Sequence, residues 1–404
     1  MLQCAVWENP GMNSLAPNLP ALDPLSQQHT ERVAAYLRDH IARAGGWTPF
    51  DDWMAQALYA PGLGYYAAGS VKLAGNAAGS QAPAGDFVTA PELTPLFAQT
   101  IAREMAPVLQ ELGVAQVLEF GAGTGALAAD LLDALEQLGL QASYSIVEVS
   151  ADLRERQRVR LARFGDRVRW LDTLPQTFEG CVVGNEVLDA MPVKLFCWGE
   201  SSELLERGVG VGADGSFVWA DRPAGDDLTA RVVSRMPPLP GYVSEINLQG
   251  EAFVQGMGDW LVRGVAFLFD YGFPQREFFH PQRAGGTLMC HLRHVAHADP
   301  LVAVGVQDIT AHVDFTAMAD AALKGGLDVL GYTSQGTFLL NAGLADILGR
   351  LDAGDVRAYA QAVAPVQKLV SQAEMGELFK VLALGREVDM SLAGFARGDR
   401  RHML

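Results

Sequence analysis

The pattern of hydrophobic and polar positions along this chain changes at about residue 114. Beyond that point, short apolar runs alternate with segments in which apolar residues recur every three or four positions. Such runs are typical of buried strands, and the second pattern is typical of helices that cover a sheet. We expect strands at 115–119, 144–149, 168–171 and 181–184, and helices at 126–138 and 152–164. The alternation predicts an α/β fold with a mostly parallel sheet.

The pattern also predicts elements on either side of this series. Helices are expected at 28–43 and 50–59. Between 204 and 219 two alternating segments flank Asp214-Gly215, which is typical of a β-hairpin. Later expected elements are a strand at 266–269, a helix at 315–323, a strand at 327–332, a helical stretch at 339–364 and a last strand at 378–384.

These elements predict one core that is interrupted by insertions. A helical cap precedes the core, and each end of the chain forms a tail. The expected parts are a disordered or draped tail at 1–25, the helical N-terminal cap at 26–95, the first half of the core at 96–200, an insertion with the hairpin at 201–260, the second half of the core at 261–390 with a helical insertion at 340–375, and a C-terminal tail at 391–404.

Composition narrows the range of partners and compartments. The 404 residues include 47 acidic and 30 basic side chains, with a net charge of -17. A protein that wraps nucleic acid or lies on an anionic membrane needs clustered positive charge, so neither is expected. The four cysteines form no CxxC pair, and no apolar run reaches the roughly 18 residues of a membrane span. The first 30 residues carry no Lys or Arg, whereas a signal or transit peptide carries positive charge. A cytoplasmic location is therefore expected.

A glycine-rich segment carries the strongest local signal. The run from Val117 leads from a strand into Gly121-Ala122-Gly123-Thr124-Gly125, which opens a helix. Missing side chains let a ligand approach the backbone at a helix N-terminus. Gly121, Gly123 and Ala126 also match the dinucleotide fingerprint, so glycine spacing alone leaves the cofactor open.

Acidic residues near the strand ends favour S-adenosylmethionine. Glu119 would repel a pyrophosphate but attract a cationic sulfonium and ammonium. Glu148 follows the next strand, where it can accept hydrogen bonds from ribose hydroxyls, and Asp172 follows the third, near an adenine amino group. The alternatives are a structural turn with solvent-facing acids, or a nicotinamide or flavin site.

The fourth strand leads into Asn185 and Glu186, followed by Asp189. In a doubly wound sheet these residues face the crevice opposite the glycine loop. Glu186 and Asp189 could clamp a guanidinium and turn one nitrogen toward a methyl donor. Alternatively, Asp189 caps a following helix and Glu186 is solvated. The nearby sequence supplies no further ligands for a metal.

Two later segments compete for a share of the site. Asp270-Tyr271-Gly272 directly follows a predicted buried strand, and the segment 308–315 offers Asp308 or His312 as site residues, or Asp314 as a helix cap.

His291, His294 and His297 would fan out on a helix, so zinc is not expected. A cluster of arginines predicts a solvated helix face, with a patch for an acidic partner as the alternative. These arginines are Arg154, Arg156, Arg158, Arg160, Arg163, Arg167 and Arg169.

Seven motifs in this order resemble the MidA-type methyltransferase family, the relatives of a mitochondrial complex I assembly factor. The motifs are Gly85-Asp86-Phe87-Val88-Thr89-Ala90-Pro91-Glu92, the Glu119–Gly125 loop, Val147-Glu148-Val149-Ser150 with Leu153-Arg154 and Gln157, Asn185-Glu186-x-x-Asp189-Ala190-Met191-Pro192, Asp270-Tyr271-Gly272, the segment 308–315, and Glu374-Met375-Gly376-Glu377-x-Phe379-Lys380. The resemblance covers about residues 30 to 385.

The resemblance implies a class I, Rossmann-like fold and S-adenosylmethionine as cofactor. In the mitochondrial members it implies symmetric dimethylation of a protein arginine. This chain departs from the family in having no transit peptide, which suggests a bacterial member, and in Ala90, where the motif often has serine. The implied cofactor-binding residues are Asp86, Phe87, Glu119, Gly121, Ala122, Gly123, Gly125, Glu148, Val149, Asp172 and Asn185. The candidate catalytic residues are Asn185, Glu186, Asp189, Asp270 and His312.

Three functions therefore stand as hypotheses. The first is methylation of a protein arginine. The second is a complex-assembly factor that works mainly by binding a partner, and the third is a nicotinamide-dependent oxidoreductase. The oligomeric state is left open, with a homodimer as one alternative.

Overall fold

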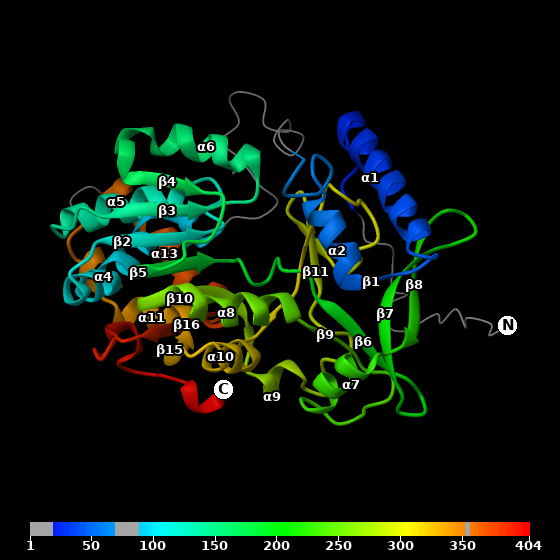
Figure 1. Ribbon diagram of the computed structural model, residues 1–404. Helices are drawn as coiled ribbons and strands as arrows, with labels where there is room; N and C mark the ends of the chain where they lie inside the picture. Colours follow the sequence, from blue (N-terminus) through cyan, green and yellow to red (C-terminus); the bar gives the residue numbers. More distant parts are fainter. Residues whose placement is uncertain (1–18, 69–88, 352–355) are drawn as a thin grey trace. The chain divides into compact units, whose positions relative to one another are not determined.

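The computed structural model describes residues 19–68, 89–351 and 356–404 (Figure 1). Asp86 and Phe87, which the motifs assign to the cofactor, lie outside these residues, as does the expected tail up to residue 18. The chain divides into two compact units, each described here by itself. Unit 1 comprises Met1–Phe87, Ala190–Gln249 and Phe279–Ala311, and unit 2 comprises Val88–Asp189, Gly250–Phe278 and His312–Leu404.

Unit 2 is built around an eight-stranded sheet. Its strands are β2 (Gln116–Phe120), β3 (Ser143–Val147), β4 (Val168–Leu171), β5 (Phe178–Asn185), β10 (Leu261–Phe273), β14 (Val313–Asp314), β15 (Asp328–Ser334) and β16 (Phe379–Arg386). Their order is β15-β16-β10-β5-β2-β3-β4, and β14 pairs with β10. Strands β10, β5, β2, β3 and β4 are mutually parallel, whereas β16 runs antiparallel to β10 and β15. The predicted mostly parallel sheet is therefore present.

Helices pack on both faces of this sheet (Figure 1). The α-helices of unit 2 are α3 (Ala90–Leu93), α4 (Pro95–Leu112), α5 (Ala126–Gln137), α6 (Ala151–Leu161), α8 (Leu248–Trp260), α9 (Gln275–Phe278), α10 (Phe315–Lys324), α11 (Gln335–Asn341), α12 (Leu344–Leu348), α13 (Val356–Val370) and α14 (Met375–Leu378). The 3-10 helices are η2 (Ala162–Arg167), η3 (Ala393–Phe395) and η4 (Arg401–Met403).

Alternation along the strands separates two hydrophobic layers. Val117 and Phe269 belong to a core that also contains apolar side chains of α4, α5 and α11. Phe120 contacts Phe253 and Trp260 of α8 instead. Because successive side chains of a strand point to opposite faces, burial on both faces explains the uninterrupted apolar runs. Because these strands run parallel, their carboxyl ends lie at one edge of the sheet, where the predicted site residues follow them.

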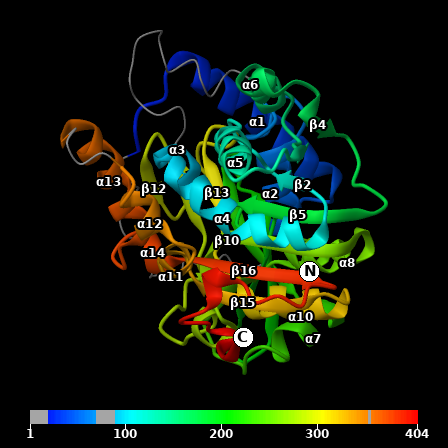
Figure 2. The same cartoon turned by 90° about the vertical axis from the view of Figure 1, so that its left-hand side faces the viewer.

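The expected helical stretch at 339–364 is divided in the structure. Gly343, with φ of +95°, separates α11 from α12, and α13 begins at Val356. A left-handed residue cannot continue a right-handed helix, so the glycine ends the first segment. Figure 2 shows α11, α12, α13 and α14 gathered together, in agreement with their contacts.

Unit 1 contains two smaller sheets. The five-stranded sheet has the order β1-β7-β6-β9 with β8 beside β7, and the three-stranded sheet has the order β12-β11-β13. The elements are α1 (Pro24–Arg43), β1 (Thr48–Pro49), α2 (Phe50–Tyr59), β6 (Lys194–Trp198), β7 (Leu204–Val211), β8 (Phe217–Pro223), α7 (Asp226–Val233), β9 (Val243–Ile246), β11 (Met289–Leu292), β12 (Val295–His297) and β13 (Asp308–Thr310). The predicted hairpin around Asp214-Gly215 is confirmed by the pairing of β7 with β8.

The structure groups 279–311 with unit 1, whereas the sequence placed this segment in the second half of the core. The physical reason is its apolar surface. Cys290, Val304 and Ile309 are buried in one cluster with side chains of α1 and α2. The histidines from His291 to His297 lie in the β11–β12 hairpin rather than on a helix.

Candidate active site

The glycine loop connects β2 to α5 at the carboxyl edge of the unit 2 sheet. Gly121, Gly123 and Gly125 all have positive φ, between 53° and 82°, which L side chains rarely adopt. A Cβ on Gly123 would meet no atom within 4 Å, so the loop backbone is open there. Gly125 is the N-cap of α5, where backbone N–H groups are free to bind a polar ligand.

Glu148 follows β3 and is almost completely buried. One carboxylate oxygen accepts a hydrogen bond from the Ser150 backbone N–H at 2.9 Å, and the other accepts from the Gln157 amide at 3.1 Å. Burial raises the pKa of Glu148, while these two donors oppose the shift. The carboxylate is thus held in one orientation beside the glycine loop.

Arg154 ties the ends of β3 and β4 together. Its guanidinium donates to the backbone oxygens of Glu148 at 2.7 Å and Leu171 at 2.9 Å. It also forms an ion pair with Asp172, whose side chain is 84% exposed. Val149, the neighbour of Glu148, is 76% exposed. An apolar surface therefore lies next to the fixed carboxylate of Glu148.

Glu119 differs from the expectation of a charged group facing a cation. It is fully buried within β2 and accepts a hydrogen bond from the Tyr144 hydroxyl at 2.8 Å. Burial raises the pKa of Glu119 to about 8, the Tyr144 hydrogen bond lowers it, and the Glu148 charge raises it further. A mostly protonated carboxyl offers little charge to a sulfonium at neutral pH, so the electrostatic argument for this residue weakens.

The segment after β5 holds Asn185 and Glu186 in an unusual conformation. Glu186 has φ of +54°, a left-handed value that is uncommon for a residue with a side chain. Its backbone N–H donates to the Phe269 carbonyl at 2.9 Å, and its carboxylate accepts from the Asn185 amide at 3.0 Å. The Asn185 side-chain oxygen is buried without a hydrogen-bond partner. Strain and an unsatisfied polar atom often mark functional sites.

Asp270, at the end of β10, braces this segment. It is 1% exposed, and one of its oxygens accepts from the backbone N–H groups of Leu188 at 2.9 Å and Asp189 at 3.2 Å. Burial raises the pKa of Asp270 well above its usual range, and the Asp189 and Glu186 charges add to this shift. The structure thus brings three predicted carboxylates together.

The alternative role of Asp189 as a helix cap is wrong. The chain forms a turn after β5 and then enters β6 at Lys194, so no helix begins there among the described residues. The Asp189 backbone N–H is held by Asp270, and its side chain is 2% exposed. The connection is too short and too tightly held by β10 for a helix to form.

The block 308–315 is divided between the two units. Asp308, in unit 1, is fully buried and accepts hydrogen bonds from the Tyr66 hydroxyl at 2.8 Å and the Ile309 N–H at 3.0 Å. His312, in unit 2, has a ring centroid 5.0 Å from that of Tyr271 and 5.4 Å from that of Phe273. The capping alternative for Asp314 is confirmed, because its carboxylate accepts from the first N–H groups of α10.

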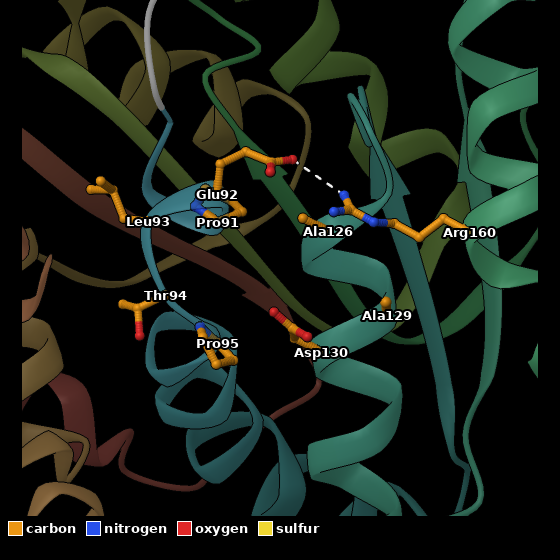
Figure 3. Close-up of a pocket in the computed structure, with 9 residues that line it drawn as sticks. All are labelled: Pro91, Glu92, Leu93, Thr94, Pro95, Ala126, Ala129, Asp130 and Arg160. Atoms are coloured by element: carbon orange, nitrogen blue, oxygen red, sulfur yellow. Dashed lines mark hydrogen bonds and ion pairs between the residues drawn. The ribbon is translucent and has the colours of Figure 1, made fainter. Parts of the chain in front are cut away.

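A pocket of about 190 Å³ lies beside the glycine loop (Figure 3). Glu92 and Arg160 point toward each other across it, with Arg160 Nη1 3.3 Å from Glu92 Oε1, and Asp130 points from α5 toward the start of α4. Arg160 also donates to the Thr124 hydroxyl, which in turn donates to Glu92. Of the predicted site residues that the structure describes, none lines this pocket. The described lining is Pro91, Glu92, Leu93, Thr94, Pro95, Ala126, Ala129, Asp130 and Arg160.

The arginine-rich helix is paired within unit 2. Six of the seven arginines form ion pairs with acidic side chains, which favours the solvated helix face over a patch for an acidic partner.

In the described part of the chain, no three His, Cys, Asp or Glu side chains come together as ligands for a metal ion. No helix within these same residues is both long and apolar enough to cross a bilayer.

Comparison with known proteins adds the family. Residues 100–333 match a family model described as "Putative S-adenosyl-L-methionine-dependent methyltransferase". This match covers more than half of the chain. The chain belongs to this methyltransferase family. The MidA-type resemblance is confirmed, and the nicotinamide oxidoreductase hypothesis is set aside because the cofactor of the family is S-adenosylmethionine.

Solved structures support the same fold for this methyltransferase. A Burkholderia thailandensis protein crystallised with S-adenosyl-homocysteine is 52% identical, with a TM-score of 0.89, and the match covers 96% of this chain and 100% of that one. A native structure from the same organism is 51% identical, with a TM-score of 0.87 and the same coverage. The predicted class I, Rossmann-like fold is therefore confirmed.

Named relatives of the methyltransferase are mitochondrial. The Drosophila melanogaster homolog of the protein arginine methyltransferase NDUFAF7 is 28% identical over 87% of this chain and 84% of its own length. The Mus musculus protein arginine methyltransferase NDUFAF7 is 27% identical over 90% of this chain and 86% of its own length.

The residues of this methyltransferase fit S-adenosylmethionine on structural grounds. The glycine loop leaves its backbone open at Gly123. Glu148 presents a fixed carboxylate of the kind that accepts hydrogen bonds from hydroxyls, and exposed Val149 offers an apolar surface for a ring. The unsatisfied oxygen of Asn185 can accept one further hydrogen bond from a ligand.

Sequence reasoning missed the residues that support this site. Gln157 and Arg154 hold the ends of the strands, and both belong to a quoted motif, yet Gln157 was given no role and Arg154 was expected only as part of a solvated helix face. Thr124 and Arg160 were missed as the link from the glycine loop to Glu92. Gln157, Arg154 and Thr124 lie within the quoted motifs, which was their only signal, and Arg160 was visible only as one of the clustered arginines.

Proposed function

We propose that this methyltransferase transfers a methyl group to a guanidinium nitrogen of an arginine in a protein substrate. The observation that carries the proposal is the half-buried Glu186 carboxylate beside Asn185 at the carboxyl edge of the sheet, on a segment whose backbone Asp270 holds. A carboxylate suits a cationic acceptor, and a guanidinium presents a planar set of donors to it. The names of the mitochondrial relatives support the same acceptor.

On the cofactor side, residues that follow different strands bind different parts of S-adenosylmethionine. The backbone of Gly121, Ala122, Gly123 and Gly125 receives the methionine end, where N–H groups at the start of α5 favour a carboxylate. Glu148 accepts hydrogen bonds from the ribose hydroxyls, because its orientation is already fixed.

The adenine end is assigned to the neighbouring surface. Val149 offers an exposed apolar contact for the ring, and Asp172 accepts one hydrogen bond from its amino group. Glu119, in β2 just before the loop, is held in place by its hydrogen bond with Tyr144. Of these groups, Asp172 is the most exposed and is expected to contribute least.

On the acceptor side, Glu186 and Asn185 orient the nucleophile. Bound S-adenosylmethionine supplies an electrophilic methyl group on a sulfonium. The Glu186 carboxylate accepts a hydrogen bond from a guanidinium N–H. This hydrogen bond localises electron density on the attacking nitrogen, and the carboxylate receives the proton that this nitrogen loses on methylation. Asp270 and Asp189 position this segment, since Asp270 holds its backbone. His312 remains a predicted catalytic residue among the rings at the end of β10.

The acceptor can be identified with labelled S-adenosylmethionine. Lysate proteins from a strain lacking this gene are incubated with the purified protein and a deuterated methyl donor, then digested and analysed by mass spectrometry. The expected result is labelled methylarginine with wild type and little or none with Glu186→Gln. Labelling confined to another residue type, or to small molecules, would contradict the arginine proposal while leaving the methyltransferase activity intact.

A further inference from the structure

Gln157 is a buried polar residue of α6 that reaches both the end of β3 and the glycine loop. It is 0% exposed, and its side chain makes three hydrogen bonds. The amide nitrogen donates to the Gly123 carbonyl at 2.8 Å and to Glu148 Oε2 at 3.1 Å. The amide oxygen accepts from the indole N–H of Trp170 on β4 at 2.9 Å. One side chain therefore connects the glycine loop, the end of β3 and β4.

The direction of this amide follows from the chemistry of its partners. An indole N–H can only donate, so the amide oxygen must face Trp170. The other two partners are a carbonyl and a carboxylate, which both accept, so the NH₂ group must face Gly123 and Glu148. A flipped amide would lose all three hydrogen bonds, and the network therefore admits one orientation.

Backbone hydrogen bonds from Gly121 to Val147 and from Gly125 to Ala122 also hold the glycine loop, and Gln157 binds the Gly123 carbonyl between them. Gly121, Gly123 and Gly125 carry no side chains and all lie in the left-handed region. A Cβ on Gly125 would lie 3.4 Å from the Gln157 Cγ, so the side chain also packs against the loop. A loop of this kind would lose conformational entropy on binding a ligand unless it is fixed beforehand.

We propose that Gln157 is a positioning residue of the cofactor site, which holds the glycine loop and the Glu148 carboxylate in register, and that Trp170 sets the direction of its amide. The proposal rests on the assignment of Glu148 to the ribose. Gln157 occupies one oxygen of Glu148 and the Ser150 N–H occupies the other, so the remaining lone pairs face the cofactor in a fixed geometry.

The test compares Gln157→Met with the matched control Gln137→Met, which makes the same change at an exposed position near the end of α5. Methionine keeps a similar length and removes all three hydrogen bonds. In calorimetry with S-adenosylhomocysteine, Gln157→Met should raise the Kd roughly 10- to 30-fold at unchanged stoichiometry, since the lost bonds involve a charged group. Gln137→Met should bind like wild type.

Stoichiometry separates positioning from a merely structural role. A damaged fold would lower the fraction of protein that binds and leave the Kd of the rest unchanged, and that result would overturn the proposal. A Kd for Gln157→Met equal to that of wild type would overturn it as well. In turnover, the KM for S-adenosylmethionine should rise while kcat changes little. Absence of binding by wild type would instead refute the cofactor assignment itself.

Trp170→Phe provides a second variant that leaves Gln157 in place. It removes the donor that orients the amide, and we expect a roughly 3- to 10-fold rise in Kd for S-adenosylhomocysteine. If Trp170 acts through Gln157, adding Trp170→Phe to Gln157→Met should have almost no further effect. Fully additive effects would refute the proposed role of Trp170, and this variant still gives an answer if Gln157→Met does not fold.

Discussion

Glu148 and Glu186 occupy comparable positions in unit 2 but differ in burial, hydrogen-bond partners and backbone conformation. Both follow parallel strands at the same edge of the sheet. Glu148 is buried, and the chain itself supplies a donor to each of its carboxylate oxygens. Glu186 is half-buried, has a left-handed backbone and lies beside an Asn185 oxygen without a partner. One acid is held in place through both oxygens, and the other lies in a strained segment beside an Asn185 oxygen that can still accept a hydrogen bond.

The strained conformation of Glu186 is maintained by its neighbours on β10. A left-handed non-glycine residue costs roughly 1–3 kcal/mol, which the surrounding structure has to offset. The Glu186 N–H donates to Phe269, and Asp270 accepts from the next two backbone groups that face it. A strained residue therefore lies where the acceptor is proposed to bind, whereas the Glu148 carboxylate is held in place by the chain. The two carboxylates should therefore respond differently to the same substitution.

The largest effect is expected for Glu186→Gln. This change keeps the shape and removes the charge, so methyl transfer to lysate proteins should fall about 10²- to 10³-fold, the loss typical of one group that stabilises a transition state. Incorporation of a labelled methyl group measures the rate. Binding of S-adenosylhomocysteine, followed by calorimetry, should change by less than about 3-fold, because Glu186 is assigned to the acceptor.

Glu155→Gln is the matched control for this change, since Glu155 is an exposed residue of α6 in a surface ion pair. Its rate should stay close to that of wild type. If Glu186→Gln instead weakens S-adenosylhomocysteine binding as strongly as it slows transfer, the separation between a cofactor side and an acceptor side fails.

Glu148→Gln tests the other half of the comparison. Loss of a charged acceptor should weaken S-adenosylhomocysteine binding about 10- to 100-fold in calorimetry. The pKa of Glu148 is raised by burial, and the ionised form is the better acceptor for hydroxyl groups. Affinity of the wild type should therefore decline as the pH is lowered through this raised pKa, and Glu148→Gln should lose that part of the pH dependence. An unchanged affinity would remove Glu148 from the ribose site.

Glu119 should affect stability more than binding. Its pKa is about 8 in the folded chain against 4.5 for the ordinary group, so between these values the unfolded state releases a proton that the folded state keeps. Ionisation then favours unfolding, and stability declines as the pH rises through this window. Relative to Glu119→Gln, the wild type should lose about 1 kcal/mol of unfolding free energy for each pH unit, measured by denaturant titration without cofactor. If the unfolding free energies of wild type and Glu119→Gln changed with pH in the same way, Glu119 would already be ionised in the folded chain over this range.

The parallel core could be predicted because its signals are local. Buried parallel strands produce apolar runs, and the glycine loop is continuous in sequence, so β2 was expected within one residue of its bounds. Division into units was less accessible. The segment 279–311 packs with α1 and α2 through apolar side chains whose partners lie more than 200 residues earlier in the chain, and no local pattern encodes such distant contacts.

Which residues follow the ends of the strands was predictable, but their charge states and partners were not. Glu119 looked like a counterion because its place before the glycines is visible in sequence. The burial that raises its pKa arises only from packing with Tyr144. Likewise, Asp189 seemed able to cap a helix, and only the register of β10 beside β5 reveals that Asp270 holds its backbone. Long-range packing decides both cases.

The smallest effect is expected for Asp172→Asn, which probes the edge of the preorganised region. The Asp172 side chain is 84% exposed and is paired with Arg154, which keeps its hydrogen bonds to the Glu148 and Leu171 carbonyls without it. Solvent competes with an exposed acceptor, so affinity for S-adenosylhomocysteine should fall by no more than about 3-fold in calorimetry. Arg154→Met should cost more, because it releases the ends of both strands. If Asp172→Asn alone weakens binding 10-fold or more, preorganisation extends past Glu148 to the adenine end, and the contrast with Glu186 would then separate two groups of strand ends along one edge of the sheet rather than two carboxylates.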